Sequence, residues 1–572
     1  MLSMRHLSCV VLGLCGLSPI AAQKPSLGNR LDNYLHRCVA HGWSGSVLVA
    51  RKGVFHVKGG YGLADRKAGR KNTANTLFEI ASATKQFTAA AILKLEEQGK
   101  LSTSDLITKF LPGVPENCRE FTIYHLLTHS SGMPRRAVGG TGENLEAAVK
   151  AYLAKGPVRK PDTLFEYWNG GYALLAGIVA KASGISYTEY CRKHLFEPAG
   201  LKNTGFTGDQ NLPAPEAVGY NGSRRERSAL EHPYGSYGWQ YRGMGGAVST
   251  VNDLYRWDRA LLGDKILSKN SRKKLLKPHL GSYACGWYIV NKGHLKITHG
   301  GDVRGFHTQY MRFPEEDATI IVTSNVDGVP LWTIAFNIES MLFGTELRYP
   351  VPPPIAVLKA NDMAAVLGTY EVSAADRVVV RGHGSGIRVG GVGRTIVPML
   401  DDSRFSSVKK RSFPKEEDLA VRVIQSLAKG EVDLLRETMH KRIPGPWPDE
   451  VKNSLWPKQT QKLGALESVR VVDAELTRYN RVGILLELTH AKGRGHTRIE
   501  FANGVLMILN LNGPEYAVTL DLVPTAKDQF TRFNWSQKPT ITLTIERGQG
   551  GRVVAILLRS VRGEETRAAK VK

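Results

Sequence analysis

The sequence has few cysteines and no two of them close together. Two of the six cysteines in 572 residues fall in the first 22 residues, and the others are Cys38, Cys118, Cys191 and Cys285. The lack of a CxxC pair excludes the common structural zinc motifs, and we expect neither a metal nor a cofactor. Whether the four cysteines form disulfides or stay as buried thiols is left open.

Long apolar segments are also absent after the N-terminus. No later segment has the roughly 18 unbroken apolar residues that a transmembrane helix needs. Residues 1–22 combine Arg5, an apolar run over 7–17 and the small residues Ala21 and Ala22, the layout of a cleavable secretory signal. We therefore predict a signal peptide, a periplasmic or secreted protein, and no transmembrane segment after signal removal. The alternative is a buried N-terminal helix.

Acidic residues are in deficit, with 52 Asp and Glu against 77 Lys and Arg and a formal net charge of +25. A nucleic-acid-binding surface concentrates such charge and interleaves it with aromatic residues. The densest basic cluster, 269–277, instead indicates the solvated face of a helix that contains Leu275 and Leu276. We expect no nucleic-acid partner and leave affinity for anionic cell-envelope material open.

The length predicts two or more domains, because single cores rarely grow beyond about 250–300 residues. A stiff proline-rich linker at 349–354 divides a domain over 23–350 from an accessory region over 351–572. In the first domain, strand-like segments at both ends enclose mostly helical sequence. This order predicts an α+β fold, with an antiparallel sheet flanked by helices and an inserted helical subdomain.

The accessory region is predicted to be mostly β, with one helix near 416–437, and to form one or two modules. Its tryptophans belong either to a carbohydrate- or protein-binding surface or to a core; they are Trp447, Trp456 and Trp535. The glycine-rich stretch 390–393 is not followed by a helix, so we interpret it as a tight hairpin and not as a phosphate-binding loop.

The first candidate for chemistry is Ser82-Ala83-Thr84-Lys85, at the predicted start of a helix over 82–98. A serine hydroxyl needs a base to become a nucleophile, and a lysine three residues on lies on the same helix face. Desolvation there would lower the lysine pKa. The same spacing recurs elsewhere, for example at Ser426 and Lys429, so the motif alone is not specific.

Two further motifs follow in order. Tyr167-Trp168-Asn169 leads into a predicted helix, and His299-Gly300-Gly301 ends a predicted strand. Ser-x-x-Lys, Tyr-x-Asn and His-x-Gly in this order resemble the active site of the serine β-lactamase-like and penicillin-binding-protein-like superfamily. Its members include class C β-lactamases, D-alanyl-D-alanine carboxypeptidases, D-aminopeptidases and related esterases. The stretches 126–132 and 245–250 are also similar to the family, and the resemblance covers about 30–345.

The resemblance implies a role for each matching residue. Ser82 would form the acyl-enzyme, and Lys85 and Tyr167 would share the work of general base and acid, with the acceptor of the serine proton left open. Asn169 would hydrogen-bond the substrate. Asp302, just after the third motif, would complete an oxyanion hole with the N–H of Ser82.

Structural alternatives exist for three of these positions. Tyr167 could be a half-buried aromatic at the entry to a helix, and Asn169 could be the N-cap of that helix. For His129, within the stretch 126–132, we favour a structural hydrogen bond over a catalytic role.

The third motif departs from the Lys-Thr-Gly found in many penicillin-recognising enzymes. His299, which with Gly301 is a predicted substrate-binding residue, has an ordinary pKa near 6.5 and is mostly neutral at pH 7. We hypothesise that anionic substrates bind better below pH 6.5. Arg304 either supplies a replacement charge or forms a surface ion pair.

The sequence therefore predicts an exported serine hydrolase that acts through an acyl-enzyme on a small ester or a D-amino-acid-containing peptide or amide. One alternative is a cell-wall D-alanyl-D-alanine carboxypeptidase or β-lactamase. The other is a binding or sensor protein on the same fold, against which four intact motif residues speak: Ser82, Lys85, Tyr167 and Asn169.

Overall fold

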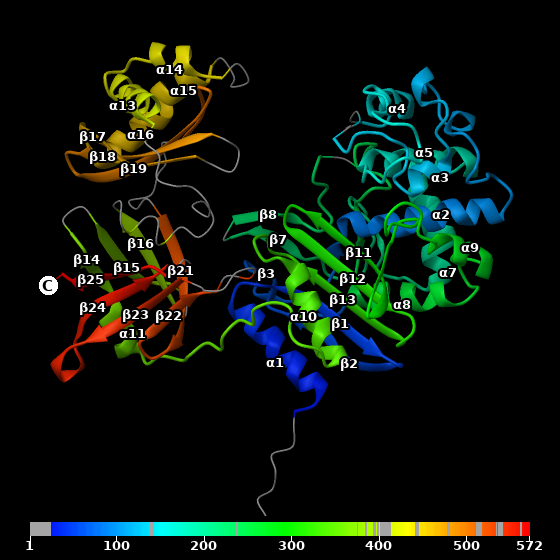
Figure 1. Ribbon diagram of the computed structural model, residues 1–572, viewed down its shortest axis with the longest axis horizontal. Coiled ribbons are helices and arrows are strands. Elements are labelled where there is room, and N and C mark those ends of the chain that lie inside the picture. Colours follow the sequence, from blue (N-terminus) through cyan, green and yellow to red (C-terminus); the bar gives the residue numbers. More distant parts are fainter. Residues whose placement is uncertain are drawn as a thin grey trace, which may run out of the picture.

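The computed structural model describes residues 25–571, except 137–138, 140–141, 223, 236, 374–375, 384–385, 393–395, 397–399, 401–412, 441–445, 477–480, 511–517, 534, 536–540 and 561–562. The predicted signal peptide lies outside the described residues. An N-terminal α+β region is followed by a C-terminal region made mostly of strands (Figure 1). The predicted fold class is thereby confirmed for the N-terminal region.

One antiparallel six-stranded sheet, in the order β10-β11-β12-β13-β1-β2, organises the N-terminal region. Its strands are β1 (Gly45–Arg51), β2 (Val54–Tyr61), β10 (Tyr288–Lys292), β11 (His294–Val303), β12 (Phe306–Phe313) and β13 (Ala318–Ser324). Because β1 pairs with β13, both ends of this region meet in the middle of the sheet, as the sequence predicted.

The alternating side chains of the central strands build one core on each face of the sheet. Val47 and Val49 pack with α1 (Leu27–Ala40) and α10 (Leu331–Phe343), whereas Leu48 faces the opposite core. That opposite core belongs to the helical insertion between β2 and β10. Its helices are α2 (Lys85–Glu97), α3 (Ile123–Leu127), α4 (Leu145–Leu153), α5 (Asn169–Ser183), α6 (Tyr187–Cys191), α7 (Glu197–Ala199), α8 (Val251–Leu262) and α9 (Lys269–Leu275).

Short strands connect the insertion to the sheet. The described ones are β3 (Leu63–Asp65), β4 (Arg70–Lys71), β5 (Phe78–Glu79), β6 (Gly205–Phe206), β7 (Val218–Asn221), β8 (Arg224–Ser228) and β9 (Ala247–Ser249). The order β5-β9-β6 brings the segment before Ser82 beside the stretch 245–250.

The C-terminal region contains a closed barrel. Its strands are β14 (Gly368–Glu371), β15 (Arg377–His383), β16 (Gly386–Val392), β21 (Val518–Ala526), β22 (Gln529–Arg532), β23 (Ile541–Arg547), β24 (Val553–Arg559) and β25 (Glu565–Lys570), and α11 (Ala360–Val366) precedes them. Pairing between β14 and β25 closes the barrel.

A second unit with its own core is inserted between β16 and β21. It contains α13 (Pro414–Ala428), α14 (Asp433–Thr438), α15 (Trp447–Glu450), α16 (Trp456–Leu463) and the sheet of β17 (Leu466–Leu476), β18 (Val482–His490), β19 (Gly493–Ala502) and β20 (Val505–Asn510). The single helix predicted near 416–437 is wrong. Gly430 has a φ of 78°, a left-handed conformation that ends α13 and separates it from α14.

Two other sequence interpretations also change. Gly390 and Gly391 lie within β16 and not in a hairpin turn, and a Cβ on Gly391 would be 2.5 Å from a methyl carbon of Leu400. Residue 393 lies outside the described residues. The candidate surface tryptophans are not exposed: Trp456 and Trp535 are buried, and Trp447 is partly buried. Trp535 joins the core that α1 and α10 cover, and it therefore contacts the N-terminal region.

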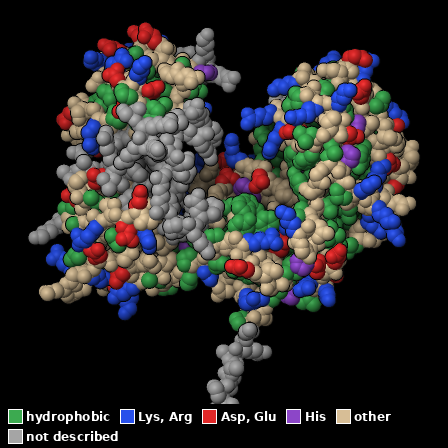
Figure 2. All heavy atoms as spheres, viewed as in Figure 1, with side chains coloured by type: hydrophobic (Ala, Val, Ile, Leu, Met, Phe, Trp, Pro, Cys, Tyr) green, Lys and Arg blue, Asp and Glu red, His purple; other side chains and the backbone are tan. Residues whose placement is uncertain are grey.

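The four cysteines outside the N-terminal segment are free and buried, which decides the open question in favour of thiols. Within the described ranges, no helix has both the length and the apolar character needed to cross a membrane. On the visible face, Lys and Arg side chains are distributed over both regions, and the molecule is hollowed between them (Figure 2).

Candidate active site

Ser82 lies where the chain leaves β5 and enters α2. It belongs to a short 3-10 turn, Ala81–Thr84, and the α-helix begins only at Lys85. Ala81 has a φ of +46°, an uncommon conformation for a residue with a side chain. Such local strain is typical of functional sites, because the surrounding structure must hold it in place.

Lys85 is fully buried behind Ser82. Its Nζ donates hydrogen bonds to Ser82 Oγ at 3.1 Å and to the carbonyl oxygen of Met244 at 2.8 Å. Among the described residues no carboxylate forms an ion pair with this amine, and burial alone holds its pKa well below the usual value. Since burial penalises the ammonium form, Lys85 is suited to accept a proton.

Tyr167 packs over the same amine, with Lys85 Nζ 5.1 Å from the centre of its ring. Burial raises the pKa of the Tyr167 phenol, and its hydrogen bond with Ser82 opposes that rise. The phenol therefore keeps its proton at neutral pH. One base and one acid, with pKa values displaced in opposite directions, lie beside Ser82.

Asn169 is exposed and is the first residue of α5. The N-cap of α5 is Trp168, without a side-chain cap hydrogen bond, so the interpretation of Asn169 as an N-cap is wrong. Its side chain is left to face the cavity above Ser82, whose lining it joins.

His129 has the structural role favoured from the sequence. Its Nδ1 accepts a hydrogen bond from the backbone N–H of Trp168 at 3.2 Å, and its ring lies 4.3 Å from that of Tyr167. His129 thereby supports the backbone segment that presents Tyr167 and Asn169.

The third motif lies on the part of β11 that extends past its neighbour. β10 pairs only with residues 294–298 of β11, which leaves the edge from His299 onward open toward the turn that carries Ser82. A Cβ on Gly301 would be 2.1 Å from the carbonyl oxygen of Ile80 and 3.1 Å from Ser82 N. The two backbones are therefore in direct contact, and only glycine fits at residue 301.

His299 is buried, with Nδ1 2.6 Å from Gly300 O and Nε2 3.3 Å from the hydroxyl oxygen of Tyr283. Burial is the largest cause that lowers the pKa of His299, to about 3. The imidazole is therefore neutral above about pH 5. The hypothesis that His299 becomes charged below pH 6.5 and attracts anionic substrates is wrong, because burial outweighs any advantage of the charge.

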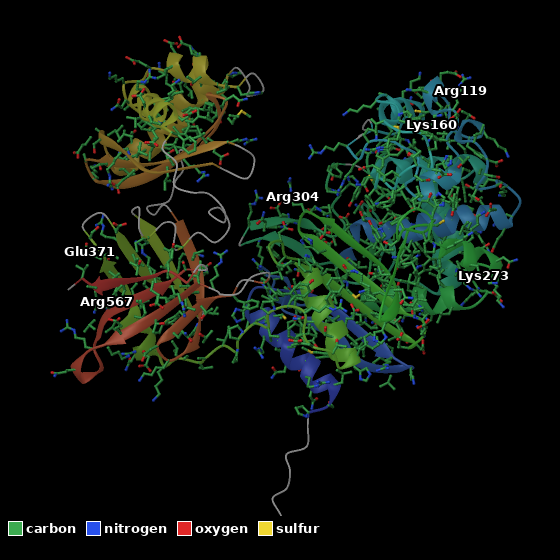
Figure 3. The ribbon with its side chains drawn as sticks, in the orientation of Figure 1. Arg119, Lys160, Lys273, Arg304, Glu371 and Arg567 are labelled. Atoms are coloured by element: carbon green, nitrogen blue, oxygen red, sulfur yellow. The ribbon has the colours of Figure 1, made fainter. Side chains whose placement is uncertain are left out.

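Arg304 lies at the rim of the cavity with its side chain 74% exposed. Its Nε is 3.9 Å from Oε2 of Glu226, the outer limit of an ion pair. The two sequence interpretations of Arg304 are thus compatible: one side chain is both a loose ion-pair partner and a cation at the cavity mouth (Figure 3).

Asp302 is tied to the neighbouring strand through a histidine that the sequence analysis missed. His307 Nδ1 lies 2.8 Å from Oδ1 of Asp302, and its Nε2 lies 2.9 Å from Oδ1 of Asp327. Burial opposes the charged imidazolium, but the two carboxylates raise the His307 pKa above its ordinary value. The charged clamp fixes the end of β11 that lies against the turn carrying Ser82.

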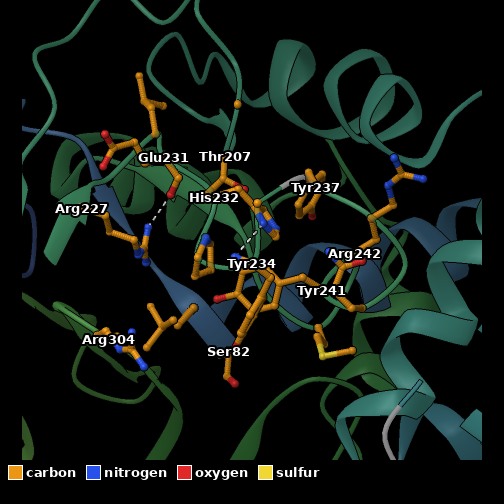
Figure 4. A pocket seen from close by; sticks show the side chains of 18 of the residues that line it. Ser82, Thr207, Arg227, Glu231, His232, Tyr234, Tyr237, Tyr241, Arg242 and Arg304 are labelled. Atoms are coloured by element: carbon orange, nitrogen blue, oxygen red, sulfur yellow. Dashed lines mark hydrogen bonds between the residues drawn. The ribbon is translucent and has the colours of Figure 1, made fainter. Parts of the chain in front are cut away.

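A cavity of about 1170 Å³ opens above Ser82. Its wall comes largely from residues 207–244, which sequence reasoning did not assign to the site; they include Arg227, His232, Tyr234, Tyr237, Tyr241 and Arg242 (Figure 4). The three tyrosines within eight residues were the available signal. Ser82, Asn169 and Asp302 face the cavity, and Lys85 and His299 lie buried behind it.

The wall is anchored to the strand before Ser82. Glu79 is fully buried and forms an ion pair with Arg227 and a hydrogen bond with Tyr241. The Glu79–Arg227 ion pair links the 207–244 segment to β5. The cavity wall and the turn that carries Ser82 are therefore both attached to β5. The described residues contain no group of His, Cys, Asp and Glu that could hold a metal ion.

Comparison with known proteins agrees with this geometry. The family model described as Beta-lactamase matches residues 31–332, more than half of the chain. Penicillin-binding protein PbpX of Bacillus subtilis (strain 168) is 32% identical over 298 residues, which are 52% of this chain and 73% of that protein. Penicillin-binding protein 4* of the same strain is 31% identical over 354 residues, 57% of this chain and 78% of that protein.

Among solved structures, the octameric penicillin-binding protein homologue from Pyrococcus abyssi shares the fold. It has a TM-score of 0.50 and 21% sequence identity and covers 84% of this chain and 98% of its own. The chain therefore belongs to the β-lactamase family, and it is a serine hydrolase related to the penicillin-binding proteins.

Proposed function

We propose that this hydrolase works through an acyl-enzyme on Ser82, and that its substrate is a D-amino-acid-containing peptide or amide or a small ester. One observation carries the proposal: a fully buried amine, with no carboxylate partner among the described residues, lies 3.1 Å from Ser82 Oγ. A lysine in this state is suited to act as a base, because burial disfavours its ammonium form and lowers its pKa.

In the first step Lys85 Nζ takes the hydroxyl proton while Ser82 Oγ bonds to the substrate carbonyl carbon, whose π-electron pair moves to the oxygen. The N–H groups of Ser82 and Asp302 stabilise this oxyanion. The contact between Gly301 and the Ser82 turn supports their convergence on one point.

In the second step the carbon–leaving-group bond breaks, and Tyr167 donates its phenolic proton to the departing amine or alkoxide. The Lys85 ammonium returns a proton to the phenol. Water then attacks the acyl-enzyme, giving its proton to the base, and Ser82 regains its own proton as the acid product leaves.

The cavity favours an extended polar substrate. Asn169 is positioned to hydrogen-bond an amide, and exposed Arg304 and Tyr234 offer a cation and an aromatic surface at the rim. A neutral His299 lacks the permanent charge with which a Lys-Thr-Gly lysine holds a β-lactam carboxylate. Peptide, amide and ester substrates are therefore favoured over β-lactams.

We further propose that the enzyme acts outside the cytoplasm, in the periplasm or as a secreted protein. The N-terminal sequence and the likeness to two penicillin-binding proteins support this location. A D-alanyl-D-alanine carboxypeptidase is the second candidate function, since two relatives are named as penicillin-binding proteins.

The test is intact-mass spectrometry after incubation with a fluorophosphonate and, separately, with a penicillin. We expect one fluorophosphonate adduct on the wild type and none on Ser82→Ala. Ser426→Ala is a matched control, since Ser426 has Lys429 three residues on, and it should be labelled like the wild type.

An adduct that persists on Ser82→Ala would contradict the assignment of the nucleophile. A stable penicillin adduct would favour the carboxypeptidase. Rapid release of D-phenylalanine from its amide without a penicillin adduct would favour the amide or ester hydrolase.

A further inference from the structure

A second cavity lies on the face of the sheet that the helical insertion covers, between α8, α9 and strands β10 to β12. Its volume is about 400 Å³, and it shares no lining residue with the cavity above Ser82. Its apolar walls include Leu261, Leu262, Leu276, Trp287, Ile289 and Leu295. Such a shape and lining are typical of a site for an apolar ligand or ligand segment.

The mouth of this cavity is basic. Lys269 and Lys273 lie one turn apart on α9, both exposed, and both line the cavity. Neither has a hydrogen-bond or ion-pair partner among the residues that the structure describes. Lys273 lies at the outer edge of the molecule, on the side away from the C-terminal region (Figure 3). These two lysines belong to the basic cluster that the catalytic site leaves unexplained.

The other charged groups of the lining are already paired. Asp258 is buried and accepts hydrogen bonds from Tyr310 and Arg312, and Arg272 binds Asp264 at 2.7 Å. Among the described residues of the lining, the unpaired charges are therefore those of Lys269 and Lys273, and both are positive. A neutral or cationic headgroup would gain nothing from these charges.

The described lining thus combines apolar walls with a cationic rim.

We propose that this cavity binds an anionic single-chain amphiphile, with its acyl chain between α8, α9 and the sheet and its headgroup on Lys269 and Lys273. The ligand class is set by the two parts of the site, since the walls exclude a polar chain and the rim selects a negative headgroup. The proposal is independent of the chemistry at Ser82.

The test uses alkyl phosphates of increasing length, each below its critical micelle concentration, with the full chain and isothermal titration calorimetry. Affinity should rise about fourfold per methylene, the factor that corresponds to burying one methylene, until the cavity is full. An alkyl trimethylammonium of equal length should bind more weakly. Affinity that does not depend on chain length would overturn the proposal.

Two variants locate the site. Leu262 is 45% exposed at the mouth, so Leu262→Trp should block entry without disturbing the core, and binding should fall at least tenfold. Val54→Trp, at an exposed residue of β2 outside the cavity, is the matched control and should bind normally. Fluorophosphonate labelling of Ser82 checks that both variants are folded.

The double variant Lys269→Ala/Lys273→Ala should weaken alkyl phosphate binding by up to about fivefold per lysine and leave an alkyl maltoside unaffected. Lys71→Ala/Lys181→Ala, at two exposed lysines outside the cavity, is the control. Equal binding to anionic vesicles by the wild type and Leu262→Trp, without binding of monomeric alkyl phosphate, would indicate a membrane surface and overturn the proposed cavity.

Discussion

The two faces of the central sheet each bury a lysine, but the two lysines have opposite surroundings. On the α2 face, Lys85 has a serine hydroxyl and a carbonyl oxygen as partners, and no carboxylate in the part of the chain that the structure describes. On the α1 and α10 face, Lys296 donates to Glu339 Oε2 at 2.8 Å. Glu339 supplies a buried counter-charge to Lys296, whereas none of the described carboxylates does so for Lys85, which is why Lys85 is the candidate base.

The largest expected effect separates the two lysines by activity and stability. Lys85→Met should lower kcat/KM by about 10²–10⁴-fold, the usual contribution of general base catalysis, and should not destabilise the fold. Lys296→Met should leave activity nearly intact but cost about 3 kcal/mol of unfolding free energy, because Glu339 stays buried with Arg348 as its remaining described ion-pair partner. Steady-state kinetics and urea denaturation measure the two effects. Equal activity losses in both variants would contradict the assignment of Lys85, and not Lys296, as the base.

The next effect contrasts two adjacent glycines of β11. Gly301→Ala should reduce kcat by about 10²–10³-fold, the cost of a lost oxyanion donor, because its Cβ would force β11 away from the Ser82 turn. Gly300→Ala is the control, since its Cβ would first meet the flexible end of Gln309 at 3.0 Å. Turnover and thermal unfolding of both variants test this, and similar turnover would contradict it.

The smallest effect concerns His307 on β12, a charged group whose ring nitrogens face the carboxylates of Asp302 and Asp327. Its folded pKa is raised, so its stabilising contribution is complete below the ordinary pKa near 6.5 and is lost as pH rises through the folded value. The difference in unfolding free energy between wild type and His307→Gln should be about 1–2 kcal/mol at pH 6 and shrink by pH 9. A constant difference across this range would show that His307 is not charged.

The sequence predicted the parts of the site that local motifs encode. Ser82, Lys85 and Tyr167 were predicted from motifs that resemble those of a known family, and strand-like segments at both ends of the first domain predicted its antiparallel sheet. The environment that gives these residues their chemistry is not local. Burial of Lys85 and His299 depends on packing between β11, α2 and α5. The sequence of any one of these segments does not predict that packing.

Other features escaped prediction because they join distant segments. The cavity wall at 207–244 reaches Ser82 through the Glu79–Arg227 pair, which spans 148 residues. The helical unit inserted between β16 and β21 interrupts the barrel, and an interrupted barrel cannot be distinguished from two consecutive modules by strand periodicity. The break at Gly430, by contrast, was visible in the sequence.

The central claim is that Lys85, with its lowered pKa, is the base that activates Ser82, and the pH dependence of Ser82 phosphonylation tests it most directly. In the wild type, the rate constant should fall as pH drops through the depressed Lys85 pKa and level off well below pH 10. Lys85→Met should lack this plateau and react slowly at every pH. Identical pH profiles for the two proteins would contradict the claim and leave Ser82 without its base.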